Sequence, residues 1–420
     1  MNEEPLNPMS TEATDKSSDT KLLEGELLSW TPDAASLQQD VLDEVLEEKY
    51  VSGEMRIVVE QARYPLKQVP DLLASADYNL QPDFQRRPRW SVETQSRLIE
   101  SFIMNVPIPP VFLYEVGYSR FEVMDGKQRL TAIGDFYRGD FALTGLAEWP
   151  ELNGRKYEEL PEQLQRGIDR RYLSSIVLLH ETAKTTEQAD RLKQLVFERI
   201  NTGGTDLSDQ EKRNALYPGR MNSLCIELSR YPPIAEMWGI PVPTETEGST
   251  DWQPPKTLLE NAMYRSMEDV ELVLRFFAHR QRRHLWRSGT RLDDYLTQYQ
   301  RDANRYSPEL LAGLGSMFRE TAQLCLKVLG PDAFHLLRER SGTRVWVARP
   351  ALIAYDPLMW AFSQTLDYVD VLIDRRQSIK QGIEQLYIER YEAFDGRKTN
   401  LVDIATRDDL VLGLIQRYIS

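Results

Sequence analysis

The 420-residue sequence predicts an α+β domain followed by a mainly α-helical domain, and three observations favour this class. Short apolar runs typical of strands alternate with helical periodicity between residues 51 and 217. From residue 218 to residue 420 the pattern becomes almost wholly amphipathic and helical. A hydrophobic content of 41% is enough to build a core in each domain.

Residues 1–50 are predicted to form an acidic, partly disordered tail. They hold 13 acidic and 3 basic side chains, a net charge of −10, whereas the whole chain carries −14. Residues 1–20 have almost no large apolar side chains, so burial cannot offset the entropy lost on ordering them. The next stretch, LLEGELLSW followed by LQQDVLDEVLEEKY, has apolar residues at helical spacing. It predicts a helix that docks on the body of the protein or on a partner.

Residues 51–217 combine predicted strands and helices. The strands are expected in EMRIVVE, PPVFLYEV, FEVMD and SIVLLHE. Ser91 is an expected N-cap for the helix VETQSRLIESFIMN. Thr185 with Gln188, and Ser208 with Glu211, form capping boxes for two further helices.

Residues 218–420 predict a domain of long amphipathic helices. The clearest segments are MEDVELVLRFFAHRQRR, PELLAGLGSMFRETAQLCLKVL and SIKQGIEQLYIERYEAF. The stretch GIPVPTETEGSTDWQPP is expected to be a long loop. Cys225 and Cys325 lie a hundred residues apart, which fits neither a disulfide framework nor a CxxC metal site, so both are expected to be buried.

Composition also limits the compartment and the chemistry. No window approaches the roughly 18 consecutive apolar residues that a membrane span needs, and the N-terminus lacks a signal-peptide pattern, which favours a cytoplasmic protein. The sequence has no GxxxxGK[ST], no HExxH and no evident Ser or Cys nucleophile motif. Because residues 51–420 carry only −4, the total charge does not exclude a polyanionic ligand.

The stretch RFEVMDGKQRLTAI, residues 120–133, contains the main candidate site. Asp125 is an expected N-cap at the end of a strand, and Gly126 allows a close approach of backbone or ligand. The amides and dipole of the helix that follows, with Lys127 and Arg129, suit a phosphate. Asp125 beside two cations also permits a Mg²⁺-nucleotide arrangement. The alternative is an ordinary capped helix with Asp125 and Arg129 as an i, i+4 ion pair.

Three further clusters each have a functional and a structural interpretation. Arg86, Arg87 and Arg89 adjoin Gln85 in a proline-punctuated loop that either binds an anion or is simply solvated. Asn201 and the glycines after it either approach a ligand or only turn the chain. A basic run interleaved with aromatic residues predicts either a nucleic-acid face or a solvated helix side whose aromatic residues are core. This run comprises Arg275, Arg280, Arg282, Arg283, Arg287 and Arg291, with Phe276, Phe277 and Trp286.

In this order, the motifs FQRRPRW, QSRLIESFIMNVPIPPVFLYE, FEVMDGKQRLTAIGDFY and FERINTGGTDLSDQEKRNALY resemble the N-terminal domain family of GmrSD-type restriction enzymes. The resemblance covers roughly residues 65–220 and implies a ParB/sulfiredoxin-like fold that binds a nucleoside triphosphate. The family hallmark Asp-Gly-Gln-Gln-Arg falls on residues 125–129, with Lys127 in place of the first Gln. This departure puts the hydrogen-bonding role of that first Gln in doubt.

The resemblance implies catalytic roles for Asp125, Gln128 and Arg129. The nucleotide would be held by Gly126 and Lys127, together with Gln85, Arg86 and Asn201, and Mg²⁺ by Asp125. The nucleotide itself, GTP, ATP or CTP, is left open.

The predicted function is a nucleotide-binding, NTP-hydrolysing regulatory or sensor subunit of a prokaryotic DNA-restriction or anti-phage system. By the resemblance, the nuclease of these systems carries a His-rich motif. This chain has four histidines and none in such a setting, so it is expected to be a stand-alone member that works with DNA and with a separate nuclease or modification subunit. The alternatives are a DNA-binding or scaffold module without turnover, using Arg280, Arg282 and Arg283, or a ParB-like nuclease. A homo-oligomer is compatible with either.

Overall fold

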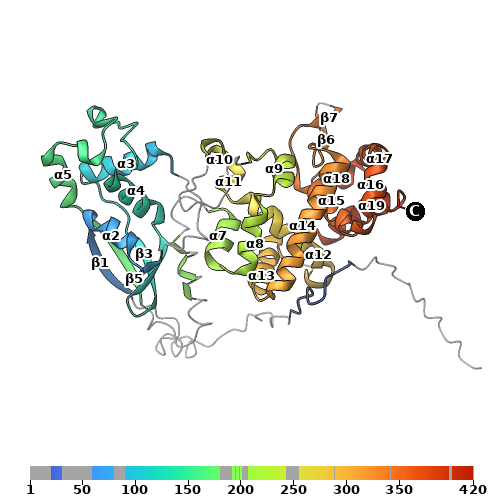
Figure 1. Cartoon of the computed structure of the whole chain (residues 1–420), viewed down its shortest axis with the longest axis horizontal. Helices are drawn as coiled ribbons and strands as arrows, with labels where there is room; N and C mark the ends of the chain where they lie inside the picture. The colour runs from blue at the N-terminus through green and yellow to red at the C-terminus, as the bar shows by residue number, and fades with distance from the viewer. Residues whose placement is uncertain are drawn as a thin grey trace, which may run out of the picture.

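The computed structural model describes most of the chain as two parts that lie side by side, an α+β part and a helical part (Figure 1). The described residues are 20–30, 59–79, 90–179, 192–193, 195–197, 199–200, 207–242, 255–287, 289–340, 342–396 and 400–419. The α+β class and the helical C-terminal region are as the sequence predicted.

A mixed five-stranded sheet forms the centre of the α+β part. Its strand order is β1-β5-β3-β4-β2, in which β1 pairs antiparallel with β5, β5 parallel with β3, β3 antiparallel with β4, and β4 parallel with β2. The strands span Val59–Pro65 (β1), Tyr78–Asn79 (β2), Val111–Gly117 (β3), Arg120–Asp125 (β4) and Tyr172–Leu178 (β5). The predicted strands at 109–116 and 121–125 therefore lie side by side as β3 and β4.

Helices pack on one face of this sheet and enclose its main core. These are α2 (Val69–Ala74), α3 (Val92–Ile103), α4 (Lys127–Arg138) and α5 (Glu162–Asp169), with 3-10 turns at Leu66–Gln68, Pro150–Leu152 and Tyr157–Glu159. Ile99 and Ile133 from the helices meet Val111 and Val123 from the strands, and all four are essentially buried. Ser91 caps α3 as predicted, because its Oγ accepts a hydrogen bond from Thr94 N.

Helix α7 (Asp209–Leu216) connects the sheet to the helical part. Ala215 and Leu216 pack against the small apolar cluster on the opposite face of the sheet, which contains Met124. The predicted capping box is confirmed, since Ser208 Oγ accepts from Glu211 N and Glu211 Oε2 accepts from Ser208 N. The other predicted capping box, Thr185 with Gln188, lies outside the described residues.

The helical part combines long helices with several short ones. Its helices are α8 (Arg220–Leu228), α9 (Pro232–Trp238), α10 (Lys256–Glu260), α11 (Ala262–Arg265), α12 (Glu268–Leu285), α13 (Leu292–Ala303), α14 (Pro308–Leu329), α15 (Leu352–Ser363), α16 (Val369–Asp374), α17 (Arg376–Glu389), α18 (Tyr391–Phe394) and α19 (Leu401–Gln416), with a 3-10 turn at Leu366–Tyr368. Of the predicted loop at 239–255, residues 243–254 lie outside the described residues.

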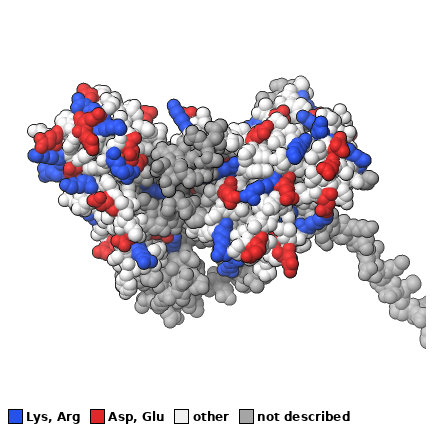
Figure 2. Space-filling model, viewed as in Figure 1, with Lys and Arg blue, Asp and Glu red and all other residues white. Residues whose placement is uncertain are grey.

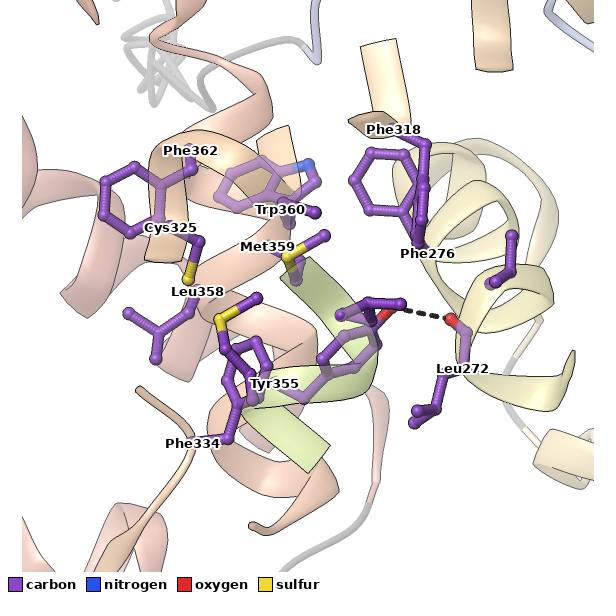
Figure 3. Close-up of a cluster of buried hydrophobic side chains, with 14 of the residues drawn as sticks. Leu272, Phe276, Phe318, Cys325, Phe334, Tyr355, Leu358, Met359, Trp360 and Phe362 are labelled. Atoms are coloured by element: carbon purple, nitrogen blue, oxygen red, sulfur yellow. Dashed lines mark hydrogen bonds between the residues drawn. The ribbon is translucent and has the colours of Figure 1, made fainter. Parts of the chain in front are cut away.

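One continuous apolar core holds these helices together, and Figure 3 shows its centre. Phe276 of α12 and Phe318 of α14 meet edge to face, with ring centroids 5.3 Å apart. Tyr355 of α15 is fully buried and donates its hydroxyl proton to Leu272 O at 2.8 Å, which satisfies its one polar group. Cys225 and Cys325 are buried free thiols, as expected, and burial raises the pKa of both.

A β-hairpin interrupts the helical part, where the sequence predicts an almost wholly helical pattern. Its strands are β6 (Leu336–Arg340) and β7 (Thr343–Val347), paired antiparallel. Two side chains attach it to the neighbouring helices. Arg338 donates to Phe394 O, and Arg344 donates to Ile388 O at 3.1 Å.

Candidate functional site

Strand β4 ends at Asp125, and helix α4 begins two residues later at Lys127. The residue between them, Gly126, is the N-cap and has φ of 95°, and no side chain caps the helix. The prediction that Asp125 caps α4 is therefore wrong. Its carboxylate instead accepts a hydrogen bond from Arg129, one turn into the helix.

Gly126 is fixed by its backbone conformation and by close contact with β3. A Cβ atom at this position would lie 2.4 Å from Val111 Cγ1 and 2.9 Å from Val111 Cβ. The left-handed φ is also unfavourable for any residue with a side chain. Both constraints require glycine here and bring the first turn of α4 against the start of β3.

Two contacts hold Arg129. Its Nη2 lies 2.6 Å from Asp125 Oδ2, and its Nη1 donates to Pro109 O at 2.9 Å. The side chains of Asp125 and Arg129 are 24% and 13% exposed, so both stay in contact with solvent. The i, i+4 ion pair that the sequence allowed is thus present, and Pro109 is an additional partner that spacing along the chain could not reveal.

The first turn of α4 has no side-chain cap. An Asp or Ser N-cap would accept a hydrogen bond from one of its first amide groups, and no described side chain does so here. Lys127 and Gln128 are half-buried at this end of the helix. Gln128 Oε1 is buried and accepts no hydrogen bond within the described part of the chain. The corner therefore offers amide donors, two cations and one buried acceptor.

The remaining predicted nucleotide-binding residues are Gln85, Arg86 and Asn201. Gln85 and Arg86 fall in residues 80–89, and Asn201 falls in residues 201–206, all outside the described residues. Their grouping with Asp125 stays a prediction from the resemblance.

The predicted nucleic-acid face on α12 requires a correction. Arg280 is fully buried and Arg282 is 2% exposed. Arg280 pairs with Glu26, and Arg282 contacts Asp408, a residue of α19. Burial, together with the neighbouring guanidinium of Arg283, lowers the pKa of Arg282 to about 10. Arg280 and Arg282 therefore cannot meet a phosphate backbone at the protein surface.

Other residues of this run also take structural roles. Arg283 forms an ion pair with Asp409 and remains partly exposed. Phe276, Phe277 and Trp286 are core residues, which was the structural alternative. On the face shown in Figure 2, acidic and basic side chains are interspersed over both parts of the protein, without a large area of one sign.

No cluster of three or more His, Cys, Asp or Glu side chains is arranged to hold a metal ion within the described ranges. At the corner the described carboxylate is Asp125, and its Oδ2 is already bonded to Arg129. A Mg²⁺ ion here would depend mainly on water and on phosphate oxygens from a ligand, which is its usual coordination at nucleotide sites.

Residues 69–218 match the family model of the GmrSD restriction endonuclease, N-terminal domain. Residues 69–218 form a GmrSD-type N-terminal domain. No curated protein and no solved structure matches the chain. The GmrSD-type domain includes the corner at Asp125, the sheet apart from β1, and helix α7, and it ends where the helical part begins.

The described helices of this chain include none that is both long and apolar enough to cross a membrane.

Replacing Gly126 by Ala should lower the free energy of unfolding by about 2–4 kcal/mol, because the left-handed backbone and the contact with Val111 both oppose a Cβ atom. Urea unfolding followed by circular dichroism measures this change. Gly139 is the matched control, because it also has positive φ, at the other end of α4, but a Cβ there meets Lys156 Cδ at an ordinary 4.0 Å. Gly139→Ala should cost only about 1–2 kcal/mol, and equal losses in the two variants would contradict a packing constraint at Gly126.

Proposed function

We propose that this protein is a nucleotide-binding, NTP-hydrolysing subunit of a restriction system, with the phosphates bound at the first turn of α4. The observation that carries the proposal is the N-terminus of α4, which follows Gly126, has no side-chain cap and has Lys127 and Arg129 within its first turn. Backbone amides at a helix N-terminus attract phosphate through hydrogen bonds and through the helix dipole.

Each side chain of the corner has a proposed role. Arg129 contacts a phosphate oxygen, and its bonds to Asp125 and Pro109 O hold the guanidinium in one orientation. Lys127 supplies a second positive charge. The preorganised guanidinium reduces the entropy lost when the ligand binds. Gln85, Arg86 and Asn201 complete the pocket by resemblance to the family.

Asp125 is the proposed protein ligand for Mg²⁺. A magnesium ion bound to the nucleotide would neutralise phosphate charge during phosphoryl transfer. One carboxylate is sufficient at such sites, because water and phosphate oxygens supply the remaining ligands. Asp125 would then contact both the metal ion and Arg129, one carboxylate oxygen for each.

Gln128 is the proposed residue for hydrolysis. Its Oε1 is a buried acceptor that no described group satisfies, so it can accept a hydrogen bond from a water molecule. A glutamine that orients the attacking water is a known requirement of several nucleotide hydrolases. The proposal assigns Gln128 to turnover and Arg129 to binding.

The restriction role is proposed from the family of the domain, whose description names a restriction endonuclease. A nuclease component and DNA are the partners consistent with that family. Nucleotide hydrolysis at the corner would regulate the activity of such a nuclease. The rival, a DNA-binding module that uses the arginines of α12, loses its main support because Arg280 and Arg282 are buried.

Replacing Arg129 by Ala should weaken binding of the Mg²⁺ complex of GTP, ATP or CTP by about 10- to 100-fold, the loss expected for one charge-assisted hydrogen bond. Isothermal titration calorimetry with each nucleotide measures the affinity. Arg138→Ala is the matched control, because Arg138 lies on the same helix, at its opposite end, and pairs with Asp135 and Asp140. Unchanged affinity for all three nucleotides in both Arg129→Ala and Asp125→Ala would rule out a phosphate at this corner.

Replacing Gln128 by Ala should lower kcat for nucleotide hydrolysis by about 10- to 100-fold and leave the Kd of the nucleotide within about threefold. Phosphate release under saturating nucleotide measures kcat, and calorimetry on the same sample measures Kd. A kcat equal to that of the wild type would show that Gln128 has no role in hydrolysis. Hydrolysis absent from the wild-type chain would reduce the function to binding alone.

A further inference from the structure

Residues 20–30, TKLLEGELLSW, lie as an extended segment against the helical part. The segment contains one turn, closed by a bond from Glu26 N to Leu23 O at 3.0 Å, with Gly25 at φ of 77°. No backbone-to-backbone hydrogen bond joins these residues to the rest of the described chain. The segment is therefore not an added strand or helix of the fold. Docking on the body of the protein was predicted, but the predicted helix is wrong for these residues, which are extended.

Side chains of the helical part recognise the backbone of this segment. Gln281 binds it with both ends of its amide, accepting from Leu28 N at 2.9 Å and donating to Glu26 O at 2.7 Å. Tyr306 also donates to Glu26 O, and Gln364 Oε1 accepts from Lys21 N at 2.7 Å. Peptide-binding sites likewise hold an extended backbone by hydrogen bonds to its main-chain groups, with pockets for particular side chains.

An ion pair between Glu26 and Arg280 lies at the centre of the contact. Arg280 Nε and Nη2 donate to the two carboxylate oxygens at 2.8 and 2.9 Å, and both side chains are fully buried. Arg280 also donates to Lys21 O at 2.6 Å. If the segment left, a buried guanidinium would lose its counter-charge, which is costly in a low-dielectric interior. The groove is thus built for a carboxylate.

Apolar side chains on either side of Glu26 fill the rest of the groove. Leu23 lies over Gly313 of α14, where a Cβ atom would come within 3.2 Å of its Cδ1. Trp30 packs edge to face on Tyr295, with ring centroids 5.5 Å apart. Leu27 points away and is 55% exposed. The contacts therefore select the pattern Leu-x-x-Glu-x-Leu-x-Trp, in which the second leucine is Leu28.

We propose that this groove is a peptide-recognition site and that residues 20–30 of the same chain occupy it as a separable ligand. The ligand class is an extended peptide with a glutamate between apolar anchors. The site is independent of the nucleotide proposal, because its residues belong to α12, α13, α14, α15 and their connections rather than to the corner at Asp125. Because the segment and the groove belong to one chain, their association is intramolecular, which raises the effective concentration of the segment at the groove.

A nicking experiment on the full chain tests the proposal. A specific protease site is inserted within residues 31–58, the protein is folded intact and then cut, and the products are separated by size exclusion. The N-terminal fragment should elute with the body. An excess of labelled peptide with the sequence of residues 18–31 should replace it, as measured by fluorescence anisotropy.

Charge-neutral variants of the peptide give a matched comparison. The peptide with Glu26→Gln should bind the groove roughly 100-fold more weakly than the wild-type peptide, because one partner of a buried ion pair is lost. Glu24→Gln should bind like the wild type, since Glu24 is exposed. Equal affinity of the two variants would overturn the proposal. Loss of the body's near-ultraviolet circular dichroism when the fragment leaves would also overturn it, because the segment would then be part of the folding unit.

Discussion

The buried and half-buried charges of helix α12 are the constraint on which the helical part of this protein depends. A charge removed from water must be paired, and α12 carries several along one helix: Arg280 and Arg282 are buried, and Glu271 and Arg275 are half-buried. Their partners come from segments far apart in the sequence. Glu271 pairs with Arg213 of α7 at 2.5 Å, Arg275 with Asp356 of α15, Arg280 with Glu26 of the N-terminal segment, and Arg282 with Asp408 of α19.

Helix α7 connects this network to the candidate site. One side of α7 is polar and buried against the helical part, where Arg213 meets Glu271 and Asn214 Oδ1 accepts from Asn222. Its other side places Leu216 in the apolar cluster that contains Met124, the residue before Asp125. The corner that we propose for phosphate is therefore packed, through one short helix, against the part of the chain beyond the GmrSD-type domain. Such contiguous packing is the kind of connection that can couple two sites.

Features determined by local sequence were predictable, and features determined by distant partners were not. Ser91 and the Ser208–Glu211 box cap their helices as expected, because capping involves residues three positions apart. The partner of Arg280 lies 254 positions away, so its burial could not be inferred from an arginine-rich run. The hairpin of β6 and β7 was missed because it lies between strongly helical segments.

The candidate site was predicted in part. Its position on a strand-to-helix corner and the pairing of Asp125 with Arg129 follow from the spacing DGKQR. The identity of the N-cap does not follow from the spacing. Asp is generally preferred at an N-cap, but only glycine fits against Val111 at this position. The domain family of residues 69–218 was recognised from the order of the motifs, and the family match agrees with it.

Hydrogen exchange read by mass spectrometry on the full chain, with and without the Mg²⁺ complex of a nucleotide, tests the central claim most directly. A phosphate bound at the uncapped turn must use amide groups of residues 127–129 as donors. Peptides that cover residues 124–132 should therefore exchange more slowly when nucleotide is present. Nucleotide binding that slows exchange elsewhere but leaves these peptides unchanged would contradict a phosphate site at this corner.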